Sequence, residues 1–257
     1  MRIRLRFFKF DSMKYIGHLD MLRFFQKAFR RANVPMKYSE GFHPHPVMSF
    51  AAPLGVGITS EGEYLDIETT RDVDLRKLID DLNKEMVQGV SVFSARELLQ
   101  NEKKAMAAVT AADYIVFLKK DAFLFDGCDV KNTVDSFMKK ESILVTKKTK
   151  KGERELDLKP FIYRFLADDF KNASFLKNLL IEIRNDEFAC KDSDFCFFIR
   201  TSCGSIDNIK PELILTTCFP MLADKDNLFA IHRLDLYQGE YPSIVSLGEL
   251  DGSLQDA

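Results

Sequence analysis

The first half of the chain shows two hydrophobic periods, one typical of strands and one typical of helices. Residues 2–10, RIRLRFFKF, alternate basic and apolar side chains, which predicts a strand with one buried face. After Gly17 an apolar stripe and a basic stripe run at helical spacing as far as Pro35, which predicts a helix over 18–33. The same reading predicts strands at 36–39, 47–51 and 63–68, a helix from Asp72, and a strand at 90–98.

This order, β-α-β-β-(β)-α-β, is ferredoxin-like with one extra strand. A linker or bridging helix is expected at 101–111, and a similar plan then follows. Its expected elements are a helix at 130–140, strands at 113–119, 142–148, 153–158, 180–184, 195–201 and 228–237, and a helical or extended segment at 176–180. The fold class is therefore α+β, with two tandem ferredoxin-like sandwiches at 1–100 and 111–237 and an acidic tail at 238–257.

The composition is that of a globular protein, with 46% hydrophobic and 30% charged residues among 257. No apolar run is long enough for a transmembrane helix, and the charged start does not resemble a signal peptide, so we expect a cytoplasmic protein that does not enter a membrane. The five cysteines form no C-x-x-C pair, and we expect them to be small buried or partly exposed thiols.

Charge is distributed unevenly even though the formal net charge is only −2. Residues 1–50 carry ten basic and three acidic residues, a net of +7, whereas residues 238–257 carry four acidic residues and no Lys or Arg. This asymmetry favours a polyanion-binding surface with a solvated tail. The alternative is a solubilising surface whose two ends pair with each other.

Two groups of basic residues are candidates for binding phosphate. Arg2, Arg4 and Arg6 share one face of the first strand and would form a phosphate track if that face is open. Pairing with carboxylates such as Asp66 and Glu68 across the sheet is the alternative. Lys14 and the helical Arg23 are further substrate-binding candidates from the same basic segment.

The second group lies in the segment KKTKKGERE, which predicts a hairpin with a basic tip at Gly152. Such a tip suits a nucleic-acid backbone, although lysines also commonly protect an exposed edge strand. The candidate residues are Lys147, Lys148, Lys150, Lys151 and Arg154.

Three of the four histidines, His18, His43 and His45, fall within residues 18–45. In a ferredoxin-like unit the loop after the first strand and the loop between the second and third strands lie at the same end of the sheet, so the topology gathers these histidines there with Asp11, Lys14, Asp20 and Glu40. His18 and His45 could then work as a general acid and base, hold a divalent metal with the carboxylates, or fix their loops by hydrogen bonds. No nucleotide-binding loop, dinucleotide fingerprint or serine nucleophile elbow is present, and we expect no cofactor and assign no metal site.

Several motifs resemble the bacterial radical-SAM-linked protein family, a domain of unknown function. They are GHLD (17–20), RRANVP (30–35), YSEGFHPHP (38–46), SFAAPLGVG (49–57), EYLDIE (63–68), KKTKKGERELDLKPFI (147–162) and IHRLDLY (231–237). One departure is His43, where the family typically has Asn, so His18 and His45 are the firmer pair. The resemblance implies a radical-SAM enzyme as partner, because the family occurs alone or fused behind such an enzyme, and an RNA- or ribosome-linked role, because it is often encoded near ribosomal-protein and ribonuclease genes.

Three functions follow from these observations, in order of preference. The first is an RNA-binding accessory protein that presents an RNA such as tRNA or rRNA to a radical-SAM enzyme. The second is a protein–protein adaptor for that enzyme. The third is a metal-independent RNA-processing enzyme that uses His18 and His45.

Overall fold

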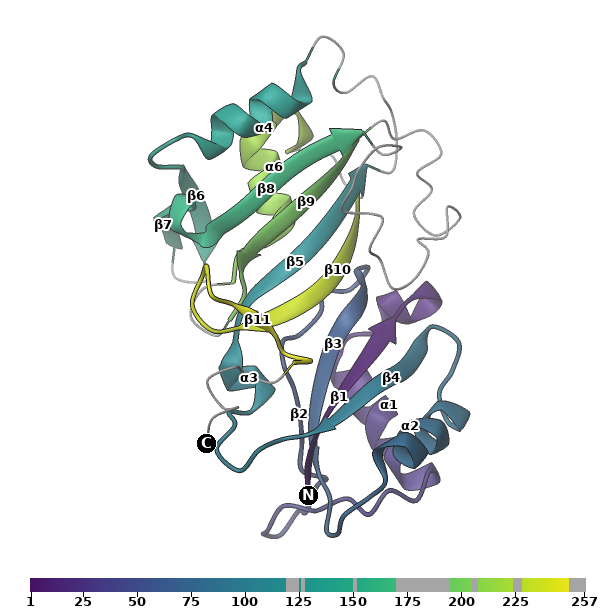
Figure 1. Ribbon diagram of the computed structural model, residues 1–257. Coiled ribbons are helices and arrows are strands. Elements are labelled where there is room, and N and C mark those ends of the chain that lie inside the picture. Colours follow the sequence, from purple (N-terminus) through teal and green to yellow (C-terminus); the bar gives the residue numbers. More distant parts are fainter. Residues whose placement is uncertain are drawn as a thin grey trace. The chain divides into compact units, whose positions relative to one another are not determined.

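The computed structural model describes residues 1–118, 125, 128–149, 152–169, 195–204, 208–223 and 228–249. The fold is of the mixed α+β class, with a large mixed sheet and few helices (Figure 1). It divides into two compact units, Ala111–Leu234 and a first unit in which Met1–Thr110 is joined by the segment from Asp235 onward. No helix in these described ranges is long and apolar enough to cross a membrane.

The first unit has the element order β-α-β-β-α-β, and its four main strands are ordered β4-β1-β3-β2 with antiparallel neighbours. A short 3-10 helix follows β1, and β11 near the C-terminus pairs with β10 (Phe229–Gln238). The elements are β1 (Arg2–Lys9), α1 (His18–Arg31), β2 (Met48–Phe50), β3 (Thr59–Glu68), α2 (Leu75–Lys84), β4 (Val90–Glu97) and β11 (Val245–Ser246).

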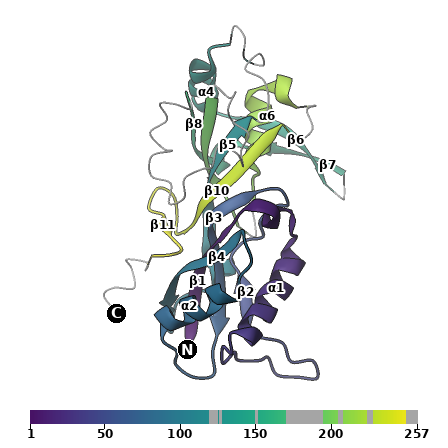
Figure 2. The ribbon, with the colours of Figure 1, turned by 90° about the vertical axis from the view of Figure 1, so that its right-hand side faces the viewer.

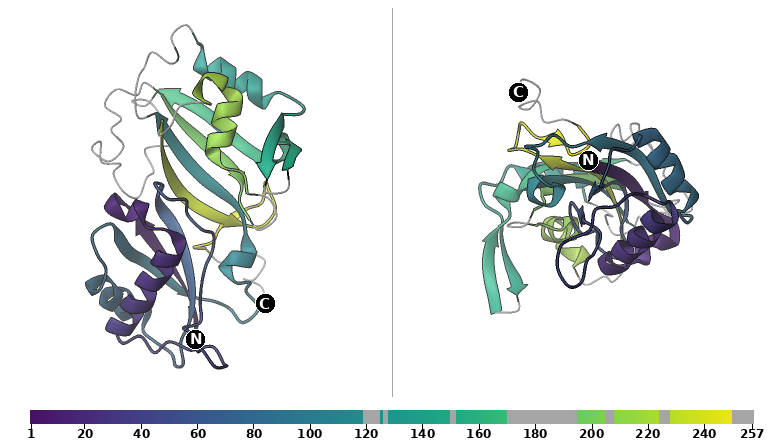
Figure 3. Two further views of the ribbon diagram at one scale, coloured as in Figure 1. Left: turned by 180° about the vertical axis from the view of Figure 1, so that it is seen from behind. Right: turned by 90° about the horizontal axis from the view of Figure 1, so that it is seen from below.

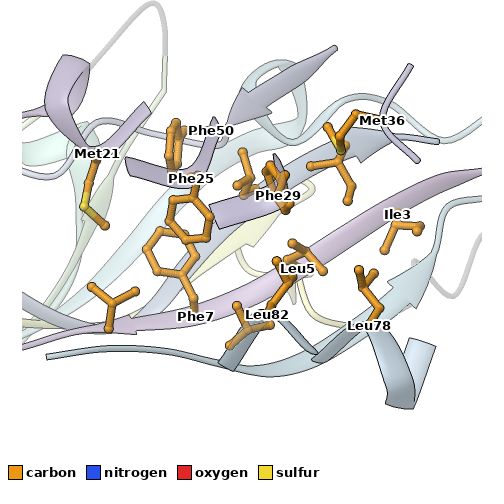
Figure 4. Packing of buried hydrophobic residues seen from close by; sticks show 14 residues of the cluster. Ile3, Leu5, Phe7, Met21, Phe25, Phe29, Met36, Phe50, Leu78 and Leu82 are labelled. Atoms are coloured by element: carbon orange, nitrogen blue, oxygen red, sulfur yellow. The ribbon is translucent and has the colours of Figure 1, made fainter. Parts of the chain in front are cut away.

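The helices α1 and α2 lie side by side over one face of this sheet (Figures 2 and 3). The apolar side chains of β1 point to that face, and the ring of Phe7 meets the ring of Phe25 with centroids 4.8 Å apart (Figure 4). Ile3, Leu5 and Phe7 are at most 1% exposed, which confirms the strand and its buried apolar face. The core therefore fixes which way the arginines of β1 point, because alternate residues of a strand face opposite sides.

The strand expected at 36–39 is not formed. Met36 and Tyr38 make only isolated bridges, to Thr69 and Pro46. The strand that follows α1 in the sheet is β2, so residues 32–47 form a single connection between them. Residues 32–47 therefore lie at the C-terminal end of α1, and not at the end where α1 begins.

In the second unit the strands are ordered β10-β5-β9-β8, and β6 and β7 form a separate hairpin. β8 and α6 were not predicted, and the elements expected at 176–184 lie outside the described residues. The elements are β5 (Val109–Leu118), α4 (Val130–Met138), β6 (Leu144–Thr149), β7 (Gly152–Asp157), β8 (Ile162–Asp169), β9 (Phe195–Ser202), α6 (Pro211–Cys218) and β10 (Phe229–Gln238).

Candidate nucleic-acid interface

Arg4, predicted as part of a phosphate track, is buried in an ion pair. Its side chain is 1% exposed, and its Nε and NH2 donate to the two carboxylate oxygens of Asp66 at 2.7 and 3.0 Å. The antiparallel register of β1 and β3 places Arg4 opposite Asp66, which is the cross-strand pairing alternative. Arg4 therefore cannot contact a phosphate.

Arg2 is engaged with the backbone that follows β4. Its guanidinium donates to the carbonyl oxygens of Leu99, Gln100 and Glu102 at 3.1, 3.2 and 2.9 Å. All three carbonyls follow the end of β4, and that of Leu99 also accepts from the Glu102 N–H at 3.1 Å. The main role visible for Arg2 is to hold residues 99–102 against the sheet.

Arg6 lies between two aromatic rings. Its guanidinium carbon is 5.6 Å from the ring centroid of Tyr64 and 5.0 Å from that of Phe93, and its NH2 is 3.5 Å from a carboxylate oxygen of Asp235. Stacking and a nearby carboxylate both suit a delocalised guanidinium. The three arginines of β1 thus do not form an open track, which corrects that prediction.

Glu102 extends the buried ionic cluster. Burial raises the pKa of Glu102, but hydrogen bonds and charge from Arg96, together with the charge of Arg4, outweigh burial and leave the pKa below its usual value. Arg4 and Arg96 also donate to the carbonyl oxygen of Leu247 at 3.3 and 3.1 Å. The cluster fastens the C-terminal segment to the sheet.

Tyr64 provides a second attachment for that segment. Its hydroxyl donates to Asp235 at 2.5 Å and lies 3.1 Å from the Ser246 hydroxyl. Burial and the nearby Asp235 carboxylate raise the pKa of Tyr64 far above its usual value. The phenol therefore stays neutral and works as a structural donor.

The outer face of α1 carries the accessible basic residues of the first unit's front segment. Arg23, Lys27 and Arg30 are exposed at spacings of four and three, so they share one stripe that extends for about 10 Å at 1.5 Å per residue. In the described part of the chain Lys27 and Arg30 have no ion pair, and Arg23 pairs only with the exposed Asp20 at 3.2 Å. An exposed pair of this kind contributes little, so all three cations remain available.

Lys14 and Tyr15 lie just before the start of α1. The Lys14 ammonium is 5.5 Å from the Tyr15 ring centroid, and the Lys14 carbonyl accepts from the backbone N–H of Gly57 at 2.8 Å. Tyr15 and Leu19 are 64% and 67% exposed. A cation and two apolar side chains therefore stand at one end of the basic stripe.

His18 is the first residue of α1 and is exposed. Its ring meets the edge of Phe50 with centroids 5.2 Å apart, beside a cavity of about 20 Å³ also lined by Met21. Such a cavity holds about one water molecule, which is too small for a substrate.

His45 lies at the opposite end of the unit. Its Nδ1 is 2.9 Å from the hydroxyl of Ser39, and its carbonyl accepts from the Ser39 N–H at 2.8 Å. Because α1 starts at His18 and residues 32–47 follow its other end, the length of α1 separates the two histidines by roughly 20 Å. The expected shared end is wrong, since it assumed the strand at 36–39; His43 and Glu40 lie with His45, and Asp11, Lys14 and Asp20 lie with His18.

The basic hairpin has the strands that the sequence predicted. β6 and β7 pair with Lys147 opposite Arg154 and Lys148 opposite Glu153. Lys150 and Lys151 lie outside the described residues. The role of this hairpin in phosphate binding stays a prediction.

Within the described ranges, no group of three or more His, Cys, Asp or Glu side chains could hold a metal ion. Cys196, Cys203 and Cys218 are buried, and Cys128 is partly exposed. Burial raises the pKa of Cys218 to about 12, so this thiol is protonated near neutral pH. Cys190 lies outside the described residues.

The sequence motifs, the α+β units and the basic helix face define a two-unit protein whose clearest feature is a charged surface on α1. The chain belongs to DUF2344, a family described as an uncharacterized protein conserved in bacteria, which matches residues 2–194. No curated protein matches the chain. The predicted site included Arg23 but not Lys27 or Arg30. The helical spacing of these two residues from Arg23 is the sequence signal that could have identified them.

Proposed function

We propose that the protein is an RNA-binding accessory protein that contacts the RNA backbone through Arg23, Lys27 and Arg30. The observation that carries this proposal is the contrast between these exposed cations and the arginines of β1. Arg4 is buried in an ion pair, and Arg2 donates to backbone carbonyls. The net charge of +7 in residues 1–50 therefore reaches solvent mainly on α1.

The physical basis is the release of counterions from RNA when phosphates are neutralised. α1 contains four basic residues and one acidic residue, a net of +3 within fourteen residues. A stripe of about 10 Å spans neighbouring phosphates of one strand, since nucleotide spacing is several ångströms. Long flexible cations on a rigid helix can contact such a backbone without reading its sequence.

The proposal is tested with the triple variant Arg23→Ala, Lys27→Ala, Arg30→Ala. RNA affinity measured by fluorescence anisotropy in about 50 mM salt should fall at least tenfold, because three phosphate contacts are lost. The matched control is Arg76→Ala, Lys77→Ala, Lys84→Ala on α2, which removes the same charge from exposed positions.

The two triple variants separate a site from a general charge effect. If α1 forms the site, the α2 variant binds RNA within about twofold of the natural protein. Equal losses in the two variants would mean that net charge alone attracts RNA. Unchanged binding in the α1 variant would contradict the proposal.

A radical-SAM enzyme is the partner in this proposal, and the family resemblance supports it. The adaptor alternative differs in what joins the two proteins. Capture from a bacterial lysate with and without nuclease distinguishes them: an RNA-dependent association disappears with nuclease, and a direct adaptor contact survives. The enzyme alternative loses its basis because His18 and His45 lie at opposite ends of the first unit.

We further infer that both units are ferredoxin-like. The strand order β4-β1-β3-β2 of the first unit and β10-β5-β9-β8 of the second support this, because each runs 4-1-3-2 when the hairpin β6–β7 is treated as an insertion. Cross-strand contacts measured by NMR between β5 and both β9 and β10 test the inference, and a different neighbour for β5 would overturn it.

A further inference from the structure

Phe42 is fully exposed, at 101% of its reference area. It lies in the connection between α1 and β2, which leaves the C-terminal end of α1 (Figure 2). A phenylalanine is usually buried because its apolar surface is unfavourable in water. A single exposed apolar residue is common on protein surfaces, so the case for a ligand contact depends on what surrounds the ring.

The loop around Phe42 is shaped by its own hydrogen bonds. Ser39 N–H donates to the His45 carbonyl at 2.8 Å, and the Ser39 hydroxyl lies 2.9 Å from His45 Nδ1 and accepts from His45 N–H at 3.1 Å. Gly41 takes a positive φ of 113°, which favours glycine. The ring is thus held outward without packing of its own, and binding to it costs less ordering entropy than binding to a disordered loop.

Charges in the loop do not suit a phosphate. Lys37 is paired with Glu68 at 3.0 Å, and Glu40 adds an exposed carboxylate. Tyr38, 51% exposed, adds a second aromatic ring. The flat apolar faces of these two rings suit stacking by a planar group such as a nucleobase, and the phosphate contacts would have to come from elsewhere.

The basic stripe leads towards this loop. It runs from Arg23 to Arg30 along α1, and the connection that carries Phe42 begins one residue after Arg31 ends the helix. A nucleic-acid strand whose phosphates follow α1 beyond Arg30 would run towards the end of the unit that carries this loop. In base-paired RNA those bases are stacked inside the duplex, whereas in a single strand they are free to stack on aromatic side chains.

We propose that Phe42 stacks on an unpaired nucleobase, so that the protein selects RNA with a single-stranded region over continuous duplex. This rests on the proposed function and adds the class of RNA to it. Stacking on an aromatic ring tolerates any base, so the selection is for unpaired structure and does not depend on sequence.

The first test compares a labelled twelve-nucleotide RNA strand with a blunt twelve-base-pair RNA duplex, by anisotropy. Phe42→Ala should weaken binding of the strand by about 5- to 150-fold, the range for one lost stacking contact, and change duplex binding less than about twofold. Phe42→Leu should behave like Phe42→Ala, because it keeps apolar area and loses the aromatic face. Val56→Ala is the matched control, since Val56 is 63% exposed on another loop of the same unit.

The second test uses the fact that the chain contains no tryptophan. Phe42→Trp places a single indole at the loop, and its emission should be quenched by the RNA strand and not by the duplex. A Val56→Trp chain should show no quenching with either RNA.

These outcomes separate the two proposals. Natural protein that binds neither RNA overturns both the proposed function and this inference. RNA binding that depends on Arg23, Lys27 and Arg30 but is unchanged in Phe42→Ala, with Phe42→Trp not quenched, overturns the stacking contact alone. Loss of a protein partner in Phe42→Ala, with RNA binding intact, would assign the ring to a protein contact and also overturn it.

Discussion

At the scale of single residues, the first unit uses its arginines in two different ways. Arg4 is buried against Asp66 and Glu102, where a charge is tolerated only with full pairing. Lys27 and Arg30 are exposed on α1 and have no ion pair in the described part of the chain. Both the arginines of β1 and the basic residues of α1 are regularly spaced in the sequence. Only their surroundings in the fold show which of them have a structural role and which are free to bind a ligand.

Arg4→Met should lower the free energy of unfolding by about 3–5 kcal/mol, because it leaves the buried carboxylates of Asp66 and Glu102 short of a partner. Urea unfolding followed by circular dichroism measures the loss. Arg4→Met combined with Asp66→Leu should recover part of the stability, since the unpaired carboxylate is removed. A loss below about 1 kcal/mol in the single variant would show that the pair is not desolvated.

The buried His232 should make the free energy of unfolding depend on pH in acid. It is 1% exposed, and burial lowers its pKa to about 3. The folded protein therefore keeps His232 neutral, whereas the unfolded chain takes up a proton below about pH 6.5, so stability is full above pH 6.5 and is lost as pH falls towards 3.

The His232 contribution should approach about 1.4 kcal/mol per pH unit within that window. The unfolding free energy of each protein is expressed relative to its own value at pH 7.5. On this scale His232→Gln should show a flatter pH dependence between pH 6 and 4 than the natural protein. An identical acid slope in the two proteins would show that His232 is protonated in the folded state.

At the scale of elements, α1 joins the core to the proposed interface. Phe25 and Phe29 on its inner face are at most 1% exposed, and Arg23, Lys27 and Arg30 occupy its outer face. This is the ordinary pattern of an amphipathic helix, so the outer face can be changed without loss of the fold.

The other helix, α2, depends on its N-cap. The Asp74 carboxylate accepts from the Lys77 N–H at 2.9 Å. Asp74→Ala should cost about 1 kcal/mol in urea unfolding and leave RNA affinity unchanged. Asp80→Ala makes the same chemical change inside the same helix and should have less than half the effect; equal losses would argue against capping.

Periodicity predicted those elements that are long and regular. The helix expected at 18–33 is α1, and the strand expected at 2–10 is β1. The prediction of a strand at 36–39 was wrong because four alternating residues fit a strand and two isolated bridges equally well. That single error moved His45 to the wrong end, since each added strand reverses the direction of the chain.

The burial of Arg4 could not be settled from periodicity. Its pairing depends on the register of β1 against β3, which are separated by about fifty residues of chain, and that register places Arg4 opposite Asp66. β8 and α6 were missed because neither shows a clear period: IYRFLADD does not alternate strictly, and PELILTTC is rich in residues of low helix propensity. The basic stripe of α1 was visible because a helix forms its faces from local spacing alone.

At the scale of the whole molecule, the first unit is completed by residues 235–249, which come after the second unit in the sequence. Leu247 accepts hydrogen bonds from Arg4 and Arg96, and Asp235 accepts from Tyr64. Without this segment, Arg4 and Arg96 each lose one acceptor, and the hydroxyl of the buried Tyr64 loses its contacts with Asp235 and Ser246. Within the segment 238–257, which was expected to be an acidic tail, residues 245–247 therefore have a structural role.

A chain that ends at Ser243 lacks β11 and Leu247. Its thermal midpoint should fall by roughly 5 °C or more, because the buried Arg4 and the partly buried Arg96 each lose an acceptor and the Tyr64 hydroxyl loses its contact with Ser246. A chain that ends at Glu249 keeps these contacts and is the matched control. Equal midpoints for the two shortened chains would contradict a structural role for residues 244–249.

The measurement that tests the central claim most directly is the salt dependence of RNA binding. The logarithm of the binding constant should fall linearly with the logarithm of the salt concentration, with a slope reduced in magnitude by about two to three when Arg23, Lys27 and Arg30 become alanine. The α2 triple variant should keep the natural slope. A slope that is unchanged by the α1 substitutions would show that these cations do not bind phosphates, and the assignment of α1 as the RNA interface would be wrong.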